Sequence, residues 1–556
     1  VARPSHRNPV GVKNRRNVVL GQMKKYNYLD EVLVDSLKQQ PLNLNYTPES
    51  HREGLATYFR EFLRAHMKTW INNENNRKPD GSKYNLNTDG LKIYTTINYT
   101  MQEMAENAVI SHMPRLQKEF FEQNETLDDS IAPFRELTSG AVDTLLRISM
   151  RRSERWRKMK YDLKKNDEEI EESFYIPKEM TVFSWAGEID TTMTPLDSMK
   201  YYKSFFRPGM MSMDPTNGYI KAWVGGMNYR HFQYDMVKKG KRQIGSTFKP
   251  FVYAAAIDQL KLSPCDTFPD SQFCIEKNKF GNVEQWCPKN SGDKYGRTRT
   301  LKNALANSVN TVTARLMDRI GPRTVVKLAK DLGIEQRILP VPSIALGTPD
   351  LSVYEMVAAY STFANKGVYT QPVFIERIDD KNGTTLYKNQ PVTRDVLSEE
   401  AAYVTVNLLE GVTKAGSGTR LRTTGADEFN RAYQNVVTGY PYEFTNPIAG
   451  KTGTTQNQSD GWFIGMVPNL VTGVWVGAED RAIHFEDIAY GQGASMALPI
   501  WGVYMKSVYQ DSTLLISQES FERPKKLTIE LDCNKFVIDS TSSGRTTDQE
   551  ILDIDF

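Results

Sequence analysis

The segment GKRQIGSTFKPFVYAAAID at residues 240–258 is the stretch that decides the fold class. Within it, GSTFKP places Ser246 and Lys249 three residues apart, so the two side chains share one face of a helix. Pro250 lacks an N–H and is tolerated only in a first turn, which predicts a helix that starts at about Ser246. The hydroxyl then lies at the positive end of the helix dipole, and a lysine in a dry site can act as its base.

This S-x-x-K pattern is weak evidence by itself. A second copy, SGDK at 291–294, is flanked by Asn and Gly and is predicted to lie in a loop. Two further motifs follow in order: SVN at 308–310, between helical stretches, and KTG at 451–453, at the start of a predicted strand. Each has a structural alternative, a turn for SVN and a solvated lysine for KTG. The ordered set of three is the signature of penicillin-binding proteins and class A β-lactamases.

Composition describes an ordinary soluble chain of more than one structural unit. The 556 residues are 39% hydrophobic and 25% charged, with a formal net charge of +3. This balance favours neither nucleic acid nor a strongly basic membrane patch. No apolar run approaches the roughly 18 residues of a membrane span, and the first residues do not resemble a signal peptide.

The first two fifths of the chain are predicted to be mainly helical. Residues 1–45 read as helix and turn, residues 54–70 as an amphipathic helix, residues 91–97 as a strand, and a further helix begins at Thr100. The charged stretch 115–175 contains acidic as well as basic residues, so a solvated helical face is favoured over nucleic-acid binding.

Two strand pairs are predicted at opposite ends of the region that holds the motifs. Residues 211–224 read as strand, turn, strand, and residues 461–476 form a second β pair. Mostly helical segments lie between them, including one opened by a capping box at 352–355 that runs through Phe363. The pattern predicts an antiparallel sheet built from both ends of a domain, with a helical block inserted.

Several segments resemble the transpeptidase domain of class A penicillin-binding proteins over residues 206–505. They are GKRQIGSTFKPFVYAAAID, NALANSVNTVTARL, ALGTPDLSVYEMVAAYSTFANKGVY, GVTKAGSGTRLR, GKTGTT and DGWFIGMVPNLVTGVWVG. The resemblance implies a serine β-lactamase/transpeptidase-like α/β fold (an α+β sandwich), with a five-stranded antiparallel sheet and an inserted helical subdomain. The expected divisions are a glycosyltransferase-domain remnant at 1–45, a mixed helical linker at 46–205, the transpeptidase domain at 206–510 and a tail at 511–556.

The resemblance also implies a role for each motif residue. Ser246 would attack the D-alanyl-D-alanine carbonyl of a peptidoglycan stem peptide, and Lys249 would take its proton. Ser308 would relay a proton to the leaving D-alanine, and Asn310 would hold the substrate amide. Lys451, Thr452 and Thr454 of the K-T-G-T segment, which also contains Gly453, would bind the terminal carboxylate. The amides of Ser246 and Thr454 would form the oxyanion hole, and β-lactams would stall the acyl-enzyme. No metal or other cofactor is expected.

The opening NPVGVKNRRNVVLGQM looks like the last motif of the family's lipid II glycosyltransferase domain. That domain's E-D-x-x-F-x-x-H-x-G motif does not occur, so we expect a chain truncated upstream, without the glycosyltransferase site or the N-terminal membrane anchor. The resemblance places the site in the periplasm, on the outer face of the bacterial inner membrane. Protein partners stay undefined.

The four cysteines leave two interpretations open. Cys265, Cys274, Cys287 and Cys533 form no C-x2-C pair, which argues against zinc. Unpaired thiols and a local disulfide both fit the residues. The extracytoplasmic location implied by the resemblance favours a disulfide, and we expect one within 265–287, between Cys274 and Cys287, with two thiols left free.

Three rival functions share part of the signature. A β-lactamase needs a group that activates water for deacylation, and the motif context identifies none. A non-catalytic β-lactam sensor would signal through a membrane segment, and the sequence shows no apolar run long enough for one. A D,D-carboxypeptidase differs only in using water in place of an amine acceptor, and the sequence does not separate it from a transpeptidase.

Overall fold

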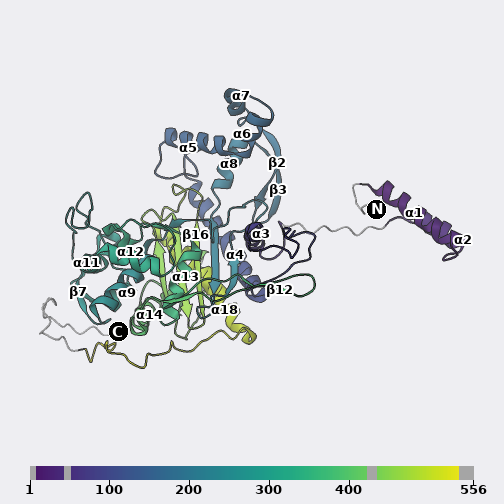
Figure 1. Cartoon of the computed structure of the whole chain (residues 1–556). Helices are drawn as coiled ribbons and strands as arrows, with labels where there is room; N and C mark the ends of the chain where they lie inside the picture. The colour runs from purple at the N-terminus through teal and green to yellow at the C-terminus, as the bar shows by residue number, and fades with distance from the viewer. Residues whose placement is uncertain (1–7, 43–51, 423–434, 537–556) are drawn as a thin grey trace. The chain divides into compact units, whose positions relative to one another are not determined.

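A five-stranded antiparallel sheet lies at the centre of the unit that begins at Leu55 (Figure 1), in the strand order β14-β15-β16-β4-β5. The computed structural model describes residues 8–42, 52–422 and 435–536. The strands are β4 (Arg207–Met213), β5 (Ile220–Val224), β14 (Ala449–Thr454), β15 (Asp460–Val467) and β16 (Leu470–Gly477). Because β16 pairs with β4, the two predicted β pairs join into one sheet, which confirms the expected fold class.

Both faces of this sheet are covered, and side chains alternate between two hydrophobic cores. Along β16, Val471 and Trp475 belong to one core, whereas Val474 and Val476 belong to the other. This is the period of two expected of a strand. The first core contains residues of α9, α11, α13 and α14, and the second contains residues of α4 and α18 (Leu498–Gln510). The sheet is therefore the middle layer of three.

The inserted helical block lies between β5 and β14. Its helices are α9 (Lys249–Leu260), α10 (Leu301–Ala306), α11 (Asn310–Ile320), α12 (Pro322–Asp331), α13 (Val353–Ala364) and α14 (Glu399–Ala415). The predicted capping box is present, since the Ser352 side chain and the Glu355 side chain each bond the other's backbone N–H at the start of α13. Short strands β6 (Arg242–Gln243), β7 (Thr267–Pro269), β8 (Thr298–Thr300), β9 (Asp350–Leu351), β10 (Val368–Thr370) and β13 (Thr393–Asp395) connect these helices.

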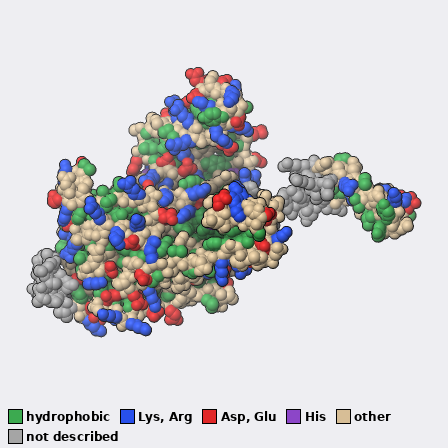
Figure 2. Space-filling model, viewed as in Figure 1, with side chains coloured by type: hydrophobic (Ala, Val, Ile, Leu, Met, Phe, Trp, Pro, Cys, Tyr) green, Lys and Arg blue, Asp and Glu red, His purple; other side chains and the backbone are tan. Residues whose placement is uncertain are grey.

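The region before the sheet is mixed, as predicted. It contains α3 (Thr57–Asn72), β1 (Lys92–Thr95), α4 (Tyr99–Asn124), α5 (Ser139–Arg152), α6 (Glu154–Arg157), α7 (Asp167–Glu172), β2 (Lys178–Ser184), β3 (Gly187–Met193) and α8 (Pro195–Lys203). Strand β1 pairs with β11 (Ile375–Asp379), which pairs with β12 (Thr385–Lys388). Basic and acidic side chains both occur on the part that holds α5 to α7 (Figure 2).

The chain divides into two compact units, one up to Gly54 and one from Leu55 onward. The first contains α1 (Pro9–Lys25) and α2 (Glu31–Gln39). The divisions at residues 45, 205 and 510 stay predictions. Across residues 8–42, 52–422 and 435–536, no helix has both the length and the apolar character to cross a bilayer.

Two disulfides are present, and all four cysteines are paired. The expected Cys274–Cys287 bridge is confirmed. The expectation of two free thiols is wrong, because Cys265 bonds to Cys533, 268 residues away. A sequence pattern of local turns cannot reveal a partner so distant.

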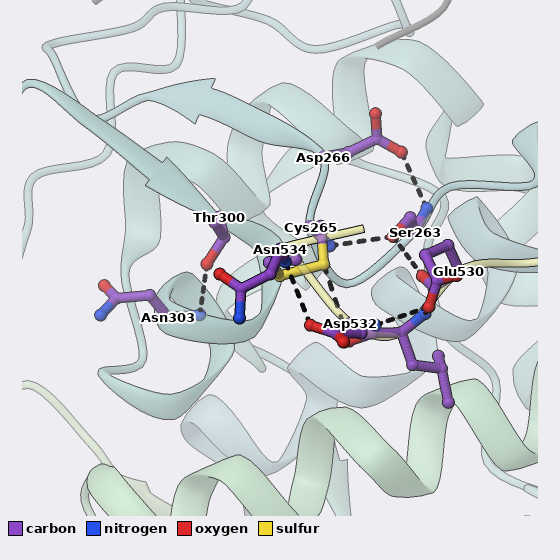
Figure 3. Close-up of a disulfide and its surroundings, with 10 residues drawn as sticks. Ser263, Cys265, Asp266, Thr300, Asn303, Glu530, Asp532 and Asn534 are labelled. Carbon is purple, nitrogen blue, oxygen red and sulfur yellow. Dashed lines mark hydrogen bonds between the residues drawn. A yellow bond between two sulfur atoms is a disulfide. The ribbon is translucent and has the colours of Figure 1, made fainter. Parts of the chain in front are cut away.

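The Cys265–Cys533 bridge fixes a C-terminal strap, which we define as residues 515–536, to the helical block (Figure 3). Beside the bridge, the Ser263 hydroxyl donates to the Glu530 carbonyl oxygen at 2.6 Å. Further along, the Glu400 carboxylate of α14 accepts from the Thr528 hydroxyl at 2.8 Å and from the Ile529 amide at 3.0 Å. Polar contacts of the residues just before Cys533 therefore add to the bridge in holding the strap in place.

Candidate active site

Ser246 lies in a short 3-10 turn, η2 (Gly245–Phe248), and α9 begins three residues later at Lys249. The predicted helix start at Ser246 is therefore wrong by three residues. Pro250 is in the first turn of α9, as predicted, and η2 leads into it. The Ser246 side chain is half-buried.

Close backbone packing fixes this turn. Gly245 adopts a φ of +52°, and a Cβ there would lie 2.8 Å from the Thr454 carbonyl oxygen of β14. The Gly245 N–H donates to the Gly347 carbonyl at 3.0 Å, and a Cβ on Gly347 would come within 1.8 Å of the Gly245 oxygen. The Tyr360 hydroxyl of α13 donates to the Thr247 carbonyl at 2.6 Å. The serine turn is thus held against β14 and α13 by contacts that leave no room for a larger residue at either glycine.

Lys249 is completely buried and points to the second motif. Its Nζ donates to Asn310 Oδ1 at 2.6 Å, to Ser308 Oγ at 3.2 Å and to the Ser308 carbonyl oxygen. Ser308 lies between α10 and α11, as predicted, with a φ of +56° that non-glycine residues rarely adopt. This strained conformation is the kind found where a site needs one particular geometry.

Lys451 reaches the same serine from the opposite side. It is fully buried on β14, and its Nζ donates to Ser308 Oγ at 3.0 Å and to the Thr452 carbonyl at 3.0 Å. The Ser308 hydroxyl therefore lies between two lysine amines, and the three motifs meet in space.

Burial changes the chemistry of both lysines, because a charged amine out of water is costly. Burial lowers the pKa of Lys451 to about 7. Burial, together with the positive charge of Lys451, places the pKa of Lys249 well below its usual range. A lysine that is neutral near pH 7 can accept a proton from a hydroxyl.

The hydroxyls of Thr452 and Thr454 in the third motif bond to two residues that the motif pattern did not predict. Thr452 Oγ1 lies 2.5 Å from Ser417 Oγ. Thr454 Oγ1 accepts the Gly493 N–H at 3.0 Å, so its own hydrogen is free to point elsewhere. A Cβ at Gly493 would approach the Trp462 and Gly453 carbonyl oxygens within 2.3 and 2.4 Å. Ser417 lies in the segment GVTKAGSGTRLR, whose resemblance to the family was visible without indicating a contact.

A buried ion pair lies just before the serine turn. Arg242 Nε donates to Asp460 Oδ1 at 2.7 Å, and the Asp460 carboxylate is fully buried. The Trp475 indole N–H also donates to Asp460 Oδ1, at 3.0 Å. The pair links β6, which leads into the serine turn, to β15 and β16.

The structure thus brings together predicted site residues from all three motifs: Lys249, Ser308, Asn310, Lys451 and Thr452. Thr454 and Gly453 lie on the same strand, against η2. The second S-x-x-K copy does not take part in this network, since Ser291 lies in the exposed turn η3 (Ser291–Asp293).

The architecture is that of a serine β-lactamase/transpeptidase-like fold. It has a sheet between two helical layers, an inserted helical block, and three motifs that meet at one site. The family model "Penicillin binding protein transpeptidase domain" matches residues 208–482, and "Penicillin-binding protein middle domain" matches residues 129–206. The chain therefore belongs to the penicillin-binding proteins and carries their transpeptidase domain, within the predicted 206–510 division.

Individual proteins agree with this assignment. Penicillin-binding protein 1A of Aquifex aeolicus is 28% identical over 558 residues, covering 96% of this chain and 68% of the relative. Penicillin-binding protein 2D of Bacillus subtilis is 32% identical over 321 residues, covering 58% and 43%. The crystal structure of penicillin-binding protein 1A from Haemophilus influenzae superposes with a TM-score of 0.59 at 22% identity, covering 90% of this chain and 76% of that one. At that identity the superposition shows the shared fold.

Proposed function

We propose that the chain is a serine D,D-transpeptidase that cross-links peptidoglycan stem peptides through an acyl-enzyme on Ser246. The observation that carries the proposal is the arrangement of Lys249 and Lys451, two buried lysines that share the Ser308 hydroxyl. The relatives that support the class A assignment match the chain over only part of their own length, 68% for the Aquifex protein and 43% for the Bacillus protein.

The chemistry follows from the protonation states. Neutral Lys249 takes the Ser246 hydroxyl proton as Oγ forms a bond to the carbonyl carbon between the two terminal D-alanines. The resulting oxyanion accepts hydrogen bonds from the amides of Ser246 and Thr454, the type of contact that contributes most in acyl transfer. The peptide C–N bond then breaks as a proton passes through Ser308 to the leaving D-alanine amine.

The second half reverses the roles. The amine of a neighbouring stem peptide attacks the Ser246 ester and loses a proton to the base, and Ser246 recovers its proton as the ester bond breaks. Water as the attacking group would give D,D-carboxypeptidase activity from the same ester.

Substrate binding is assigned to the remaining motif residues. The Thr454 hydroxyl, which already accepts from Gly493, can donate to the terminal carboxylate, and Lys451 supplies positive charge beside Thr452. The Asn310 side chain lies beside Lys249, where the substrate amide would come close. β-Lactams would acylate Ser246 as substrate mimics, and a fold neighbour, PonA1 of Mycobacterium tuberculosis, has been solved in complex with penicillin V.

An extracytoplasmic location fits the cysteine chemistry. Two disulfides pair all four cysteines, and disulfides persist in oxidising compartments. We therefore place the site on the periplasmic side of the inner membrane, as the resemblance to class A enzymes implies.

The test is covalent labelling. One equivalent of penicillin should add to the protein, and peptide mass spectrometry should locate it on Ser246. Ser246→Ala should abolish labelling, whereas Ser291→Ala, in the second S-x-x-K copy, should leave it unchanged. An adduct on the peptide that holds Ser291, or no adduct, would overturn the assignment. Incubation of the acyl-enzyme with donor and acceptor stem peptides then distinguishes cross-linking from hydrolysis by product mass.

A further inference from the structure

A buried carboxylate outside the three motifs organises the loop beside the second one. Asp270 is fully buried, and no part of its environment was indicated by the motif pattern. Its Oδ2 accepts from Arg299 Nε at 2.6 Å and from the Gly296 N–H at 3.0 Å. Its Oδ1 accepts from Thr311 Oγ1 at 2.7 Å and from Asn290 Nδ2 at 2.6 Å. These bonds lower the pKa of Asp270 although burial opposes them, so the carboxylate stays charged.

Asn290 connects the buried Asp270 carboxylate to the start of α11 through hydrogen bonds. Its Nδ2 donates to Asp270 and to the Lys294 carbonyl, which leaves Oδ1 as the acceptor on the other side. Oδ1 accepts the Asn310 N–H at 3.0 Å and the Thr311 N–H at 3.2 Å. The residue at the N-cap position of α11 is Val309, which has no side-chain cap bond. Asn290 therefore supplies from another segment the cap that the helix does not provide for itself.

The same loop decides which way the Asn310 amide faces. Asn310 Nδ2 donates to the Lys289 carbonyl oxygen at 2.6 Å. A carbonyl can only accept, so the amide nitrogen must lie on that side and Oδ1 must face the Lys249 amine, 2.6 Å away. Residues 289 and 290 thus hold both the backbone and the side chain of Asn310. They come just after Cys287 and Pro288, at the end of the loop closed by the Cys274–Cys287 bridge.

We propose that Asn290, braced by the buried Asp270, is a positioning residue of the transpeptidase site that keeps Asn310 Oδ1 directed at Lys249. The inference rests on the proposed role of Lys249 as the base. The physical reason is that a base is effective only when its hydrogen-bond partners keep it within a fraction of an ångström of its productive position beside the reacting hydroxyl.

A double-mutant cycle on the full chain tests the proposal, with acylation by a fluorescent penicillin as the rate. Asn310→Ala should slow acylation by about 10²-fold and Asn290→Ala by about tenfold, because both displace groups around the base. The double variant should be within about twofold of Asn310→Ala alone, since residues that act through one another are not additive. Ser291→Ala, the exposed neighbour, is the matched control and should keep the wild-type rate.

The pH profile separates positioning from loss of structure. Asn310 Oδ1 stabilises the charged form of Lys249, and Lys451 on β14 is the charged group that opposes it. Removing the acceptor, or freeing it to rotate, should lower the pKa of Lys249 further and move the acid limb of the acylation profile to lower pH. Asn290→Ala and Asn310→Ala should shift this limb in the same direction, and Ser291→Ala should not. A partly unfolded protein would acylate to a smaller extent at every pH, and the acid limb of its profile would not move.

The outcomes distinguish this inference from the proposed function. Labelling that survives Ser246→Ala would refute the proposed function. Labelling that requires Ser246, together with a wild-type rate and profile in Asn290→Ala, would refute only the role of Asn290. If a thermal melt shows that Asn290→Ala does not fold, Asp270→Asn, which keeps the size of the brace, should give a smaller shift in the same direction. An unshifted profile there would also overturn the inference.

Discussion

Arg242 and Lys249 are two basic residues on either side of Ser246, and the side chains of both are largely withdrawn from water. Arg242 exposes 11% of its side chain and pairs with the fully buried Asp460 carboxylate. Lys249 is fully buried, and the oxygens that accept its hydrogen bonds belong to Ser308 and Asn310, which are neutral. A carboxylate partner stabilises the charged form of a buried cation, whereas neutral acceptors leave its desolvation uncompensated. The difference supports the proposal that Lys249 serves proton transfer, whereas Arg242 stabilises the fold.

The sharpest way to break this comparison is Lys249→Arg. Arginine keeps the charge but cannot give up its proton, so acylation should fall by about 10² to 10⁴-fold, the range for losing a positioned base. Lys249→Ala should be about as slow and should melt near the wild-type temperature, because it also removes a buried amine whose desolvation is costly. The measurement is the second-order acylation rate with a fluorescent penicillin.

Lys241→Arg is the matched control for this experiment. Lys241 lies on the same segment with 39% of its side chain exposed. The Lys241→Arg variant should therefore acylate at the wild-type rate. A Lys249→Arg protein that acylates at a near wild-type rate would show that Lys249 contributes charge alone.

Asp460→Asn tests the other side of the comparison. It removes the partner of a buried cation, so we expect the free energy of unfolding to fall by about 3 kcal/mol. The melting temperature should drop, while the protein that remains folded should acylate far faster than Lys249→Arg. An unchanged melt would mean that the Arg242–Asp460 pair does not stabilise the serine turn.

The buried Lys451 should make the stability of the fold depend on pH. Burial lowers the pKa of Lys451 to about 7 from 10.5. Between these values the unfolded chain binds a proton that the folded chain lacks, so stability should rise with pH by up to about 1.4 kcal/mol per pH unit from this group. Below pH 7 the penalty is constant. Thermal melts from pH 6 to 10, compared with Lys451→Met, should show a steeper rise in the wild type; parallel curves would contradict the lowered pKa.

Ser417→Ala carries the smallest expected effect. It removes one neutral hydrogen bond to Thr452, which is expected to contribute about 1 kcal/mol, or roughly fivefold in acylation. Ser417→Thr keeps the hydroxyl and should restore most of the rate. The loss should be larger for a penicillin with a free carboxylate than for its methyl ester, since Thr452 is proposed to face that carboxylate. An equal loss for both compounds would remove Ser417 from carboxylate binding.

The sequence predicted those parts of the molecule that depend on local periodicity and on motif order. The segments 211–224 and 461–476 each read as a pair of strands joined by a turn, and the structure joins the two pairs through β4 and β16. The capping box at Ser352 was visible because both of its residues lie within one turn. The start of α9 was misplaced because Pro250 marks a first turn without saying whether a 3-10 turn precedes it.

What the sequence could not indicate are contacts between segments distant in the chain. Asn290 caps a helix 20 residues away, Ser417 reaches Thr452 from 35 residues away, and the Gly493 amide reaches Thr454 across 39. Asparagine, serine and glycine are common loop residues, and nothing in their spacing distinguishes a support of the site from a turn. Only the tertiary fold brings them together.

The bridge between Cys265 and Cys533 closes a covalent ring that contains most of the inserted block and three strands of the sheet, β14, β15 and β16. Ser308, Asn310 and Lys451 lie inside this ring, whereas Ser246 and Lys249 precede it along the chain. A single proteolytic cut between residues 265 and 533 therefore opens the ring without releasing a fragment, so the second and third motifs stay joined to Ser246. On a non-reducing gel a penicillin label on Ser246 should then migrate with the intact chain, and reduction should release the cleaved piece.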